Sequence, residues 1–393
     1  MDQTQLSILP VHLRERTRIH QEGSNDGGPF VLYWMRTAVR ADENPALDVA
    51  IAIANSWDLP VLVYHAISPH YEYASDRHHT FMLEGARDVQ AQFNELGISY
   101  AFHLTTRDDT RPHLITLAEQ AALVVTEEMP VDPPRQFLKA LTRRVATTIL
   151  CVDTACVVPM QLVKQPYTRA FEFSSATKKW YAERLTRPWP ESNRPTRRVN
   201  LVALPFEPLD LQAVSLPGLV SQCEIDHSIG PVFDTVGGSI AGYDRWNRFK
   251  KKGLVGYAKQ RNNPLVDGVS RMSAYLHYGM VSPMRLAREA AEAGNAGSDK
   301  YLEELLVWRE MAYAFCFYRA DYDGWSAIPA WAQATLEAHA SDHRDDIYSW
   351  EQLARAKTKD AFWNAAQMSL LRQGELHNNV RMTWGKAIVN WTK

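Results

Sequence analysis

FVLYWMRTAVRADENPALDVAIAIANSWDLPVLVYHAI, residues 30–67, contains two short apolar runs with an amphipathic segment between them. The runs at 30–35 and 60–67 are rich in Val, Leu and Tyr, as buried β-strands are. The segment near 45–57 has the spacing of a helix. A strand, a helix and a second strand in succession predict two parallel strands joined by a helical crossover.

The same alternation continues to about residue 159. Further strands are expected at 98–104, 122–129 and 148–159, and further helices near 78–96, 110–121 and 134–145. We therefore predict an α/β domain with a doubly wound parallel sheet over residues 28–160. No GxGxxG follows the first strand and no GxxxxGKS/T is present, which excludes a conventional dinucleotide or P-loop phosphate site.

In the second half of the chain, the spacing of the apolar residues is different. Residues 161–236 include the proline-rich segments 187–198 and 204–210, and we expect a long irregular linker there. Beyond Gly237 the strand patterns disappear and a helical domain is predicted over residues 237–393. Its expected helices lie at 240–260, 282–294, 298–319, 330–339, 349–356, 360–373 and 376–391.

The length, charge and composition of the chain exclude several classes of protein. The chain has 393 residues, a net charge of −2 and 22% charged residues, as a globular protein of two domains has. No apolar run is long enough for a membrane span, and the N-terminus is too charged for a secretory signal, so we expect an intracellular protein. The four cysteines form no CxxC pair, so neither a disulfide framework nor a metal site is expected.

Basic residues are concentrated between 245 and 271. This window can be a phosphate-binding face or a solvated basic helix, and charge alone does not decide between the two. Its members are Arg245, Arg248, Lys250, Lys251, Lys252, Lys259, Arg261 and Arg271.

The closing stretch, residues 360–393, is unusually rich in tryptophan. Trp384 and Trp391 are seven residues apart, so on a helix they share a face about two turns apart, a rise of roughly 10 Å. Trp363 lies one helix earlier, and His377, Asn378 and Arg381 form a polar cluster between them. Core aromatics and a site for a charged organic cofactor are both compatible with this pattern.

Several segments, in order along the chain, resemble one family. They are YWMRTAVRADENPALDVAIAIAN (33–55), FMLEGARDVQAQFNELGI (81–98), SRMSAYLHYG (270–279), WREMAYAFCFY (308–318) and GELHNNVRMTW (374–384). This order resembles the photolyase/cryptochrome family, and most of all the class II cyclobutane pyrimidine dimer photolyases.

The resemblance implies a light-dependent carbon–carbon lyase, a deoxyribodipyrimidine photo-lyase. Electron transfer from photoexcited reduced FAD would split pyrimidine dimers in UV-damaged DNA. It also implies an antenna chromophore of the deazaflavin or folate type in the α/β domain. We expect a monomeric, cytoplasmic protein of bacterial type that associates with the nucleoid when bound to DNA. The alternative is a cryptochrome-like flavoprotein without repair activity, or a photolyase relative with weakened or lost FAD binding.

The resemblance also implies residue roles. Glu310 would hydrogen-bond the dimer, with a structural ion pair to Arg309 as the alternative, and Met382 would pack near the lesion. FAD binding would fall to Ser270, Arg271, Met272 and Ser273 at the phosphates, and to Arg309, Asn364, Asn378 and Arg381 around the flavin. Electron transfer would use Trp363, Trp384 and Trp391, and DNA phosphates would be contacted by Arg248, Lys250, Lys251, Lys252, Arg372 and Lys386.

Class II enzymes typically continue beyond the position of Trp391 with a segment that closes over the flavin. Only two residues follow Trp391 here, so we expect either that the sequence is truncated or that this is a short relative with an altered site. Without the cover, the flavin edge at Arg381 would be wetter.

Overall fold

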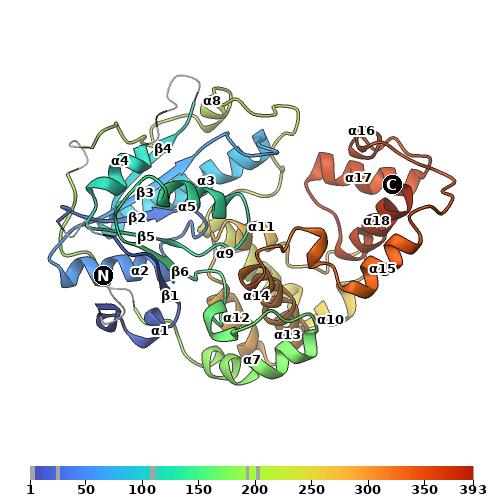
Figure 1. The fold of residues 1–393 in the computed structure, drawn as a ribbon, viewed down its shortest axis with the longest axis horizontal. Helices are drawn as coiled ribbons and strands as arrows, with labels where there is room; N and C mark the ends of the chain where they lie inside the picture. The colour runs from blue at the N-terminus through green and yellow to red at the C-terminus, as the bar shows by residue number, and fades with distance from the viewer. Residues whose placement is uncertain are drawn as a thin grey trace.

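The computed structural model describes residues 5–23, 27–106, 111, 113–191, 194–200 and 204–392. Its first half is a sheet of six strands in the order β1-β6-β5-β2-β3-β4 (Figure 1). All neighbouring strands are parallel except β1, which pairs antiparallel with β6. The strands are β1 (Thr17–Gln21), β2 (Val31–Met35), β3 (Val61–Ile67), β4 (Ser99–Leu104), β5 (Leu123–Glu127) and β6 (Ile149–Val152).

Helices cover both faces of this sheet. Val31, Tyr33 and Met35 of β2 point to one face, toward α2 and α3, whereas Leu32 and Trp34 point to the other, toward α4 and α5. Alternate residues of a strand point to opposite faces, so every residue of β2 is buried, as in a doubly wound fold. The helices of this half are η1 (Gln5–Ile8), α1 (Val11–Arg14), α2 (Pro45–Ser56), α3 (Asp76–Leu96), α4 (His113–Gln120) and α5 (Pro134–Thr142).

The predicted α/β architecture is confirmed, with one addition. β1 lies before residue 28 and so falls outside the predicted limits of the domain. Asn44 shows how the first crossover begins: its side chain accepts hydrogen bonds from the N–H groups of Ala46 and Leu47, and Pro45 occupies the first turn of α2.

The segment expected to be an irregular linker contains a helix of 16 residues, α7 (Ala170–Leu185). Tyr181 of α7 donates a hydrogen bond to the carbonyl of Leu306 at 2.7 Å, so α7 packs with the helical half of the molecule. Two short helices, α6 (Met160–Val163) and α8 (Leu216–Val220), also lie in this segment.

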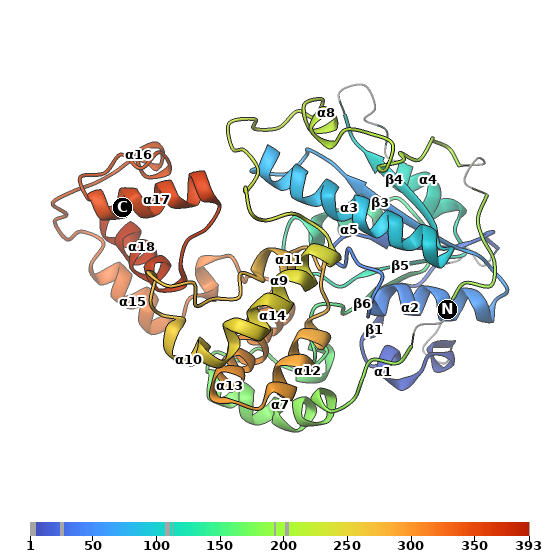
Figure 2. The ribbon, with the colours of Figure 1, turned by 180° about the vertical axis from the view of Figure 1, so that it is seen from behind.

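The remaining chain is helical, as predicted (Figure 2). The helices α13, η4 and α14 follow one another without a break, and η4 is a π-helical segment between two α-helices. The elements are α9 (Ser239–Lys252), η3 (Leu254–Gly256), α10 (Tyr257–Gln260), α11 (Ser273–His277), α12 (Pro283–Ala293), α13 (Ala296–Leu302), η4 (Glu303–Trp308), α14 (Arg309–Tyr318), η5 (Trp325–Ala327), α15 (Ala330–Ala338), α16 (Trp350–Ala354), α17 (Ala361–Gln373) and α18 (Asn378–Trp391).

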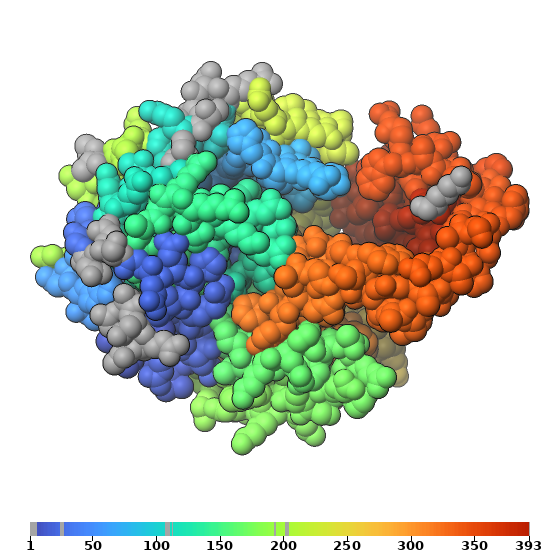
Figure 3. All heavy atoms as spheres, in the orientation of Figure 1, coloured from blue at the N-terminus to red at the C-terminus, as the bar shows by residue number. Residues whose placement is uncertain are grey.

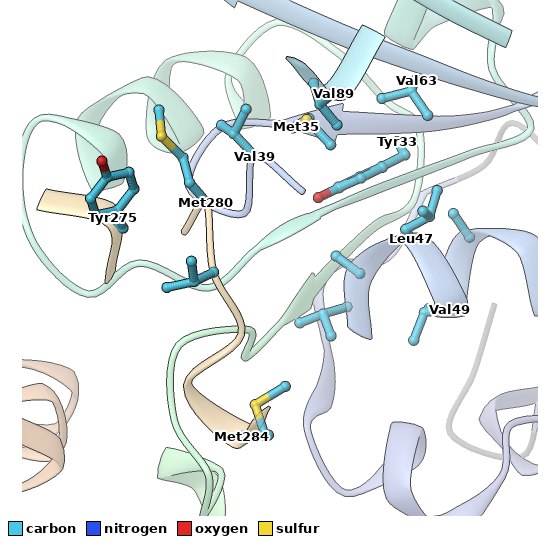
Figure 4. Packing of buried hydrophobic residues seen from close by; sticks show 14 of the residues in the cluster. Tyr33, Met35, Val39, Leu47, Val49, Val63, Val89, Tyr275, Met280 and Met284 are labelled. Carbon is cyan, nitrogen blue, oxygen red and sulfur yellow. The ribbon is translucent and has the colours of Figure 1, made fainter. Parts of the chain in front are cut away.

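The α/β half and the helices up to α14 share one apolar core. Figure 4 shows Tyr275 and Met280 of the helical half near Val39, close to the end of β2. Gly279 lies at this junction with φ of +62°, and a Cβ there would come within 2.0 Å of the carbonyl oxygen of Thr37. A residue other than glycine would therefore separate the two halves.

Residues 330–392, which we call the C-terminal lobe, have a core of their own. Tyr348, Leu353 and Trp363 form its buried cluster, which is separate from the main core. Figure 3 shows the lobe as an orange and red bulge at the right of the molecule. In the described part of the chain, no helix combines the length and the apolar character that a membrane span requires.

Candidate functional site

The three tryptophans of the C-terminal lobe form a continuous row of rings. Trp363 and Trp384 stack with centroids 5.9 Å apart and planes within 7° of parallel, and Trp391 meets Trp363 edge-on at 5.6 Å. Both tryptophans of α18 therefore contact the same partner on α17, which confirms the shared face predicted from their spacing. Aromatic contacts at these distances stabilise the lobe and also place the π-systems in succession.

Hydrogen bonds fix two of these rings. The indole N–H of Trp363 donates to the carbonyl of Trp384 at 3.0 Å, and the indole N–H of Trp384 donates to Oε1 of Gln367 at 3.1 Å. Trp363 is only 4% exposed, because it lies between the two helices. The hydrogen bonds therefore hold the rings of Trp363 and Trp384 in one orientation.

The structure brings two of the predicted flavin-binding segments together. Arg271 donates a hydrogen bond to Glu375 at 3.0 Å, and Asn379 donates to the carbonyl of Asn262 at 3.1 Å. These contacts place residues 262–271 beside the start of α18. Arg271 has φ of +51°, an unusual conformation for a large side chain, and its guanidinium also lies 3.6 Å from Asp234.

Two polar side chains at this junction, Ser273 and His377, are available to a ligand. Ser273 begins α11 and is exposed, whereas the side chain of Met272 is buried, so Met272 can offer only its backbone. Nε2 of His377, at the start of α18, is buried without a hydrogen-bond partner in the part of the chain that the structure describes. A buried polar atom without a partner is costly, and a ligand here would satisfy it.

Three other predicted residues, Asn378, Arg381 and Met382, lie within the first five residues of α18. Arg381 donates to Oδ1 of Asn378 at 2.6 Å, and its side chain is exposed. Met382 follows and is 55% exposed. Arg381 and Met382 are therefore accessible at one end of the lobe, whereas Asn378 is half-buried.

Asn364 and Arg309 are placed differently from the expectation. Asn364 donates to the carbonyl of Thr358 at 2.8 Å and accepts from both the N–H and the hydroxyl of Thr358. Arg309 donates to the carbonyl of Ala155 at 2.6 Å and lies over the ring of Tyr313. Both polar groups are used inside the protein, so binding a flavin would require these contacts to be exchanged.

Glu310 is 2% exposed and lies at the contact between α14 and the segment that follows β6. Its carboxylate accepts from the N–H groups of Val157 at 2.5 Å and Val158 at 3.2 Å, and from the hydroxyl of Tyr181 at 2.8 Å. A hydrogen bond to a pyrimidine dimer would require these contacts to open. The ion pair with Arg309, the alternative from the sequence, is not formed, because Arg309 points to Ala155.

Burial raises the pKa of Glu310 to about 7, and the hydrogen bonds from Val157 and Tyr181 only partly oppose this shift. A raised pKa in a buried carboxyl is found at catalytic sites and at structural contacts alike.

The residues of the basic window differ in whether they form an ion pair. Lys250 forms an ion pair with Glu289 at 2.7 Å, whereas Arg248, Lys251 and Lys252 are exposed on α9 and have no ion-pair partner among the described residues. Arg372, near the end of α17, and Lys386, on α18, are also exposed.

The structure adds residues that the sequence did not single out. Tyr348 extends the row of rings, since it meets Trp391 edge-on at 5.3 Å. Gln367 lies one helical turn after Trp363, and this spacing was a signal that it shares the tryptophan face. Trp308 on η4 is 47% exposed, and Glu304 on the same segment pairs with Arg261 at 2.9 Å. This end of the helix therefore has accessible side chains, whereas the side chain of Glu310 is buried.

Comparisons with known proteins agree on one family. The model of the DNA photolyase family matches residues 31–195. A deoxyribodipyrimidine photo-lyase from Methanothermobacter thermautotrophicus is 32% identical over 97% of this chain and 82% of its own length. One from Arabidopsis thaliana is 31% identical over 96% of this chain and 78% of its own length.

Solved structures show the same fold. A class III photolyase from Agrobacterium tumefaciens superposes with a TM-score of 0.69 at 18% identity, over 93% of this chain and 73% of its own. A cryptochrome from Synechocystis gives a TM-score of 0.67 at 16% identity, over 90% of this chain and 73% of its own. With an α/β half, a helical half and relatives of this identity along nearly its whole length, the chain belongs to the photolyase/cryptochrome family.

Proposed function

We propose that this protein is a deoxyribodipyrimidine photo-lyase that repairs cyclobutane pyrimidine dimers in UV-damaged DNA with light and FAD. The photo-lyases from Methanothermobacter and Arabidopsis, similar over nearly the whole chain, support the activity. The single observation that carries the electron-transfer part is the row Trp384, Trp363, Trp391, which begins one turn from Arg381. Membership of class II and an antenna chromophore in the α/β half stay predictions.

The residues present fit FAD at the junction of α11 and α18. Ser270, Arg271 and Ser273 would hold its phosphates, with Arg271 exchanging Glu375 for a phosphate oxygen. Asn378 and Arg381 would face its ring, where the guanidinium favours negative charge. When bound, FAD supplies a reduced, light-absorbing ring as electron donor. An archaeal photolyase from Sulfolobus tokodaii, with a TM-score of 0.63 and 13% identity, contains two FAD molecules.

The activity can be measured directly. The protein is loaded with FAD, reduced chemically, and mixed with an oligonucleotide that contains one thymine dimer. Under blue light we expect the dimer to be converted to thymines, read as the return of thymine absorbance, and we expect no conversion in the dark. FAD that binds and is reduced without any conversion in the light would contradict the proposed activity and favour a cryptochrome-like role.

The exposed basic residues of α9 are expected to contact DNA phosphates. Replacing Arg248, Lys251 and Lys252 by alanine should weaken binding to damaged and undamaged duplex alike. It should also reduce the slope of log K against log salt by up to about 3, since each phosphate contact contributes about 0.9. The measurement is a fluorescence-anisotropy titration at several salt concentrations.

Lys250→Ala is the matched control, because Lys250 lies on the same helix but is paired with Glu289. It should change the salt slope much less than the triple variant does. An unchanged slope in the triple variant would remove this face from the DNA interface.

A further inference from the structure

The turn between α10 and α11 carries an exposed apolar side chain at its tip. Residues 262–267 are all exposed, and Leu265 is 91% exposed. An aliphatic side chain so fully in water contributes no burial to the fold of this chain. Single exposed leucines are common on protein surfaces, so the support and the position of this one decide whether it has a use.

Hydrogen bonds at the base of this turn hold its tip in place. The N–H of Asn263 donates to the carbonyl of Gln260 at 2.9 Å, and Oδ1 of Asn263 accepts from the N–H of Leu265 at 3.0 Å. Gly268 closes the turn, and a Cβ there would come within 2.7 Å of the Cβ of Gln260. Pro264 further restricts the backbone beside the leucine. The turn therefore presents Leu265 in a defined position, and little conformational entropy is lost when a partner covers it.

The turn adjoins both surfaces that the proposed function assigns to DNA. The carbonyl of Asn262 accepts a hydrogen bond from the side chain of Asn379 at 3.1 Å, which places the turn beside the start of α18, where Met382 is exposed. Figure 2 shows the yellow chain between α10 and α11 close to the C-terminal lobe. In the chain just before the turn, Lys259 on α10 and Lys252 at the end of α9 are exposed.

A base stack is the partner that suits an apolar tip beside cations. The lysines attract DNA phosphates, whereas an uncharged aliphatic side chain next to them can contact only bases and sugars. Leucine is among the side chains that proteins insert between base steps. An enzyme that draws a dimer out of a duplex leaves a gap in the stack, and the faces of the neighbouring bases that border it are apolar.

We propose that Leu265 enters the DNA base stack beside the lesion and occupies the space that the extruded dimer leaves. The inference rests on the proposed function, because only a duplex with an extruded dimer provides this space. Leu265 supplies apolar contact to the bases, whereas the lysines bind phosphates. It is therefore a positioning residue, which contributes to the preference for damaged duplex and not to the affinity for DNA in general.

The test compares Leu265→Ala with Leu265→Met and Val255→Ala by fluorescence anisotropy. Val255 is the matched control, because it is also aliphatic, is 72% exposed and lies on η3, directly before α10. Affinities are measured for a duplex with one thymine dimer, for the same duplex without damage, and for the dimer-containing strand alone. Leu265→Ala should bind the damaged duplex about tenfold more weakly, since the burial of one leucine is lost. Its affinity for the other two substrates should not change, and the other two variants should bind as the wild type does.

The salt dependence of binding provides a second readout. The slope of log K against log salt should be the same for Leu265→Ala and the wild type, since no phosphate contact is removed. An equal loss of affinity for the single strand and for the damaged duplex would overturn the inference, because the leucine would then contact the lesion itself. Unchanged affinity of Leu265→Ala for the damaged duplex would overturn it too. A wild-type protein that binds damaged and undamaged duplex equally would contradict the proposed repair function, and this inference with it.

Discussion

Replacing Glu310 by glutamine is expected to flatten the pH dependence of stability between pH 5 and pH 7.5. Burial raises the pKa of Glu310 to about 7, so between pH 5 and about pH 7 the folded protein keeps a proton that the unfolded chain releases. The stabilisation from this group is therefore fully present below the unfolded pKa and is lost as the pH rises through about 7. For the wild type the loss is on the order of 3 kcal/mol.

The glutamine side chain has no such proton, so its free energy of unfolding should not fall in this way. It still offers one oxygen to the N–H groups of Val157 and Val158, and we expect the variant to fold. Glu310→Ala removes every acceptor at the site and leaves two buried N–H groups unsatisfied. Its free energy of unfolding should drop by about 3 kcal/mol at pH 5.

The measurement is urea unfolding of the three proteins at a series of pH values, with Glu337→Gln as an exposed glutamate control. Parallel pH profiles for wild type and Glu310→Gln would contradict the raised pKa of this carboxyl. A variant with unchanged stability but lower repair yield would instead support the lesion contact that the family resemblance implies.

Replacing Trp363 by phenylalanine is expected to slow photoreduction of bound FAD by about tenfold or more. A phenyl ring is harder to oxidise than an indole, and each 1.4 kcal/mol added to a barrier costs about tenfold in rate. Trp363 is the middle ring, in contact with both Trp384 and Trp391, so its loss interrupts the row. Repair after chemical reduction should persist, because that step does not use the row.

The same change should also destabilise the C-terminal lobe by roughly 1–2 kcal/mol, since it removes buried volume and the hydrogen bond to the carbonyl of Trp384. Transient absorption and thermal unfolding measure the two effects separately. Trp331→Phe is the control, because Trp331 lies in the lobe but is 75% exposed and outside the row. Fast photoreduction in Trp363→Phe would contradict the assigned path.

The parallel strands could be predicted because their apolar runs are continuous and bounded by polar residues. Strand β1 could not be predicted in this way, because its sequence TRIHQ is short and polar. It is an edge strand, paired on one side only, and such strands carry little of the apolar pattern that identifies central ones. The helix α7 could not be predicted for a similar reason. Its sequence AFEFSSATKKWYAERL buries only a few residues, and the segment that follows it is rich in proline.

Among the site residues, spacing predicted the tryptophan contacts well, because helical periodicity fixes which side chains share a face. The surroundings of Glu310 depend on contacts distant in sequence. Leu306, Glu310 and Ala314 are four residues apart and all three are buried, so Glu310 lies on the stripe that packs inward. Its donors come from residues 157, 158 and 181, and no local pattern indicates that pairing.

Polar contacts connect the C-terminal lobe to the rest of the molecule. Arg77 donates to the carbonyls of Leu370 and Leu371, at 2.9 and 2.7 Å, and Arg271 binds Glu375. The lobe has its own core, so it can unfold as a separate cooperative unit while the sheet stays native. Heating would then produce two transitions, and a single melting temperature would not describe this protein.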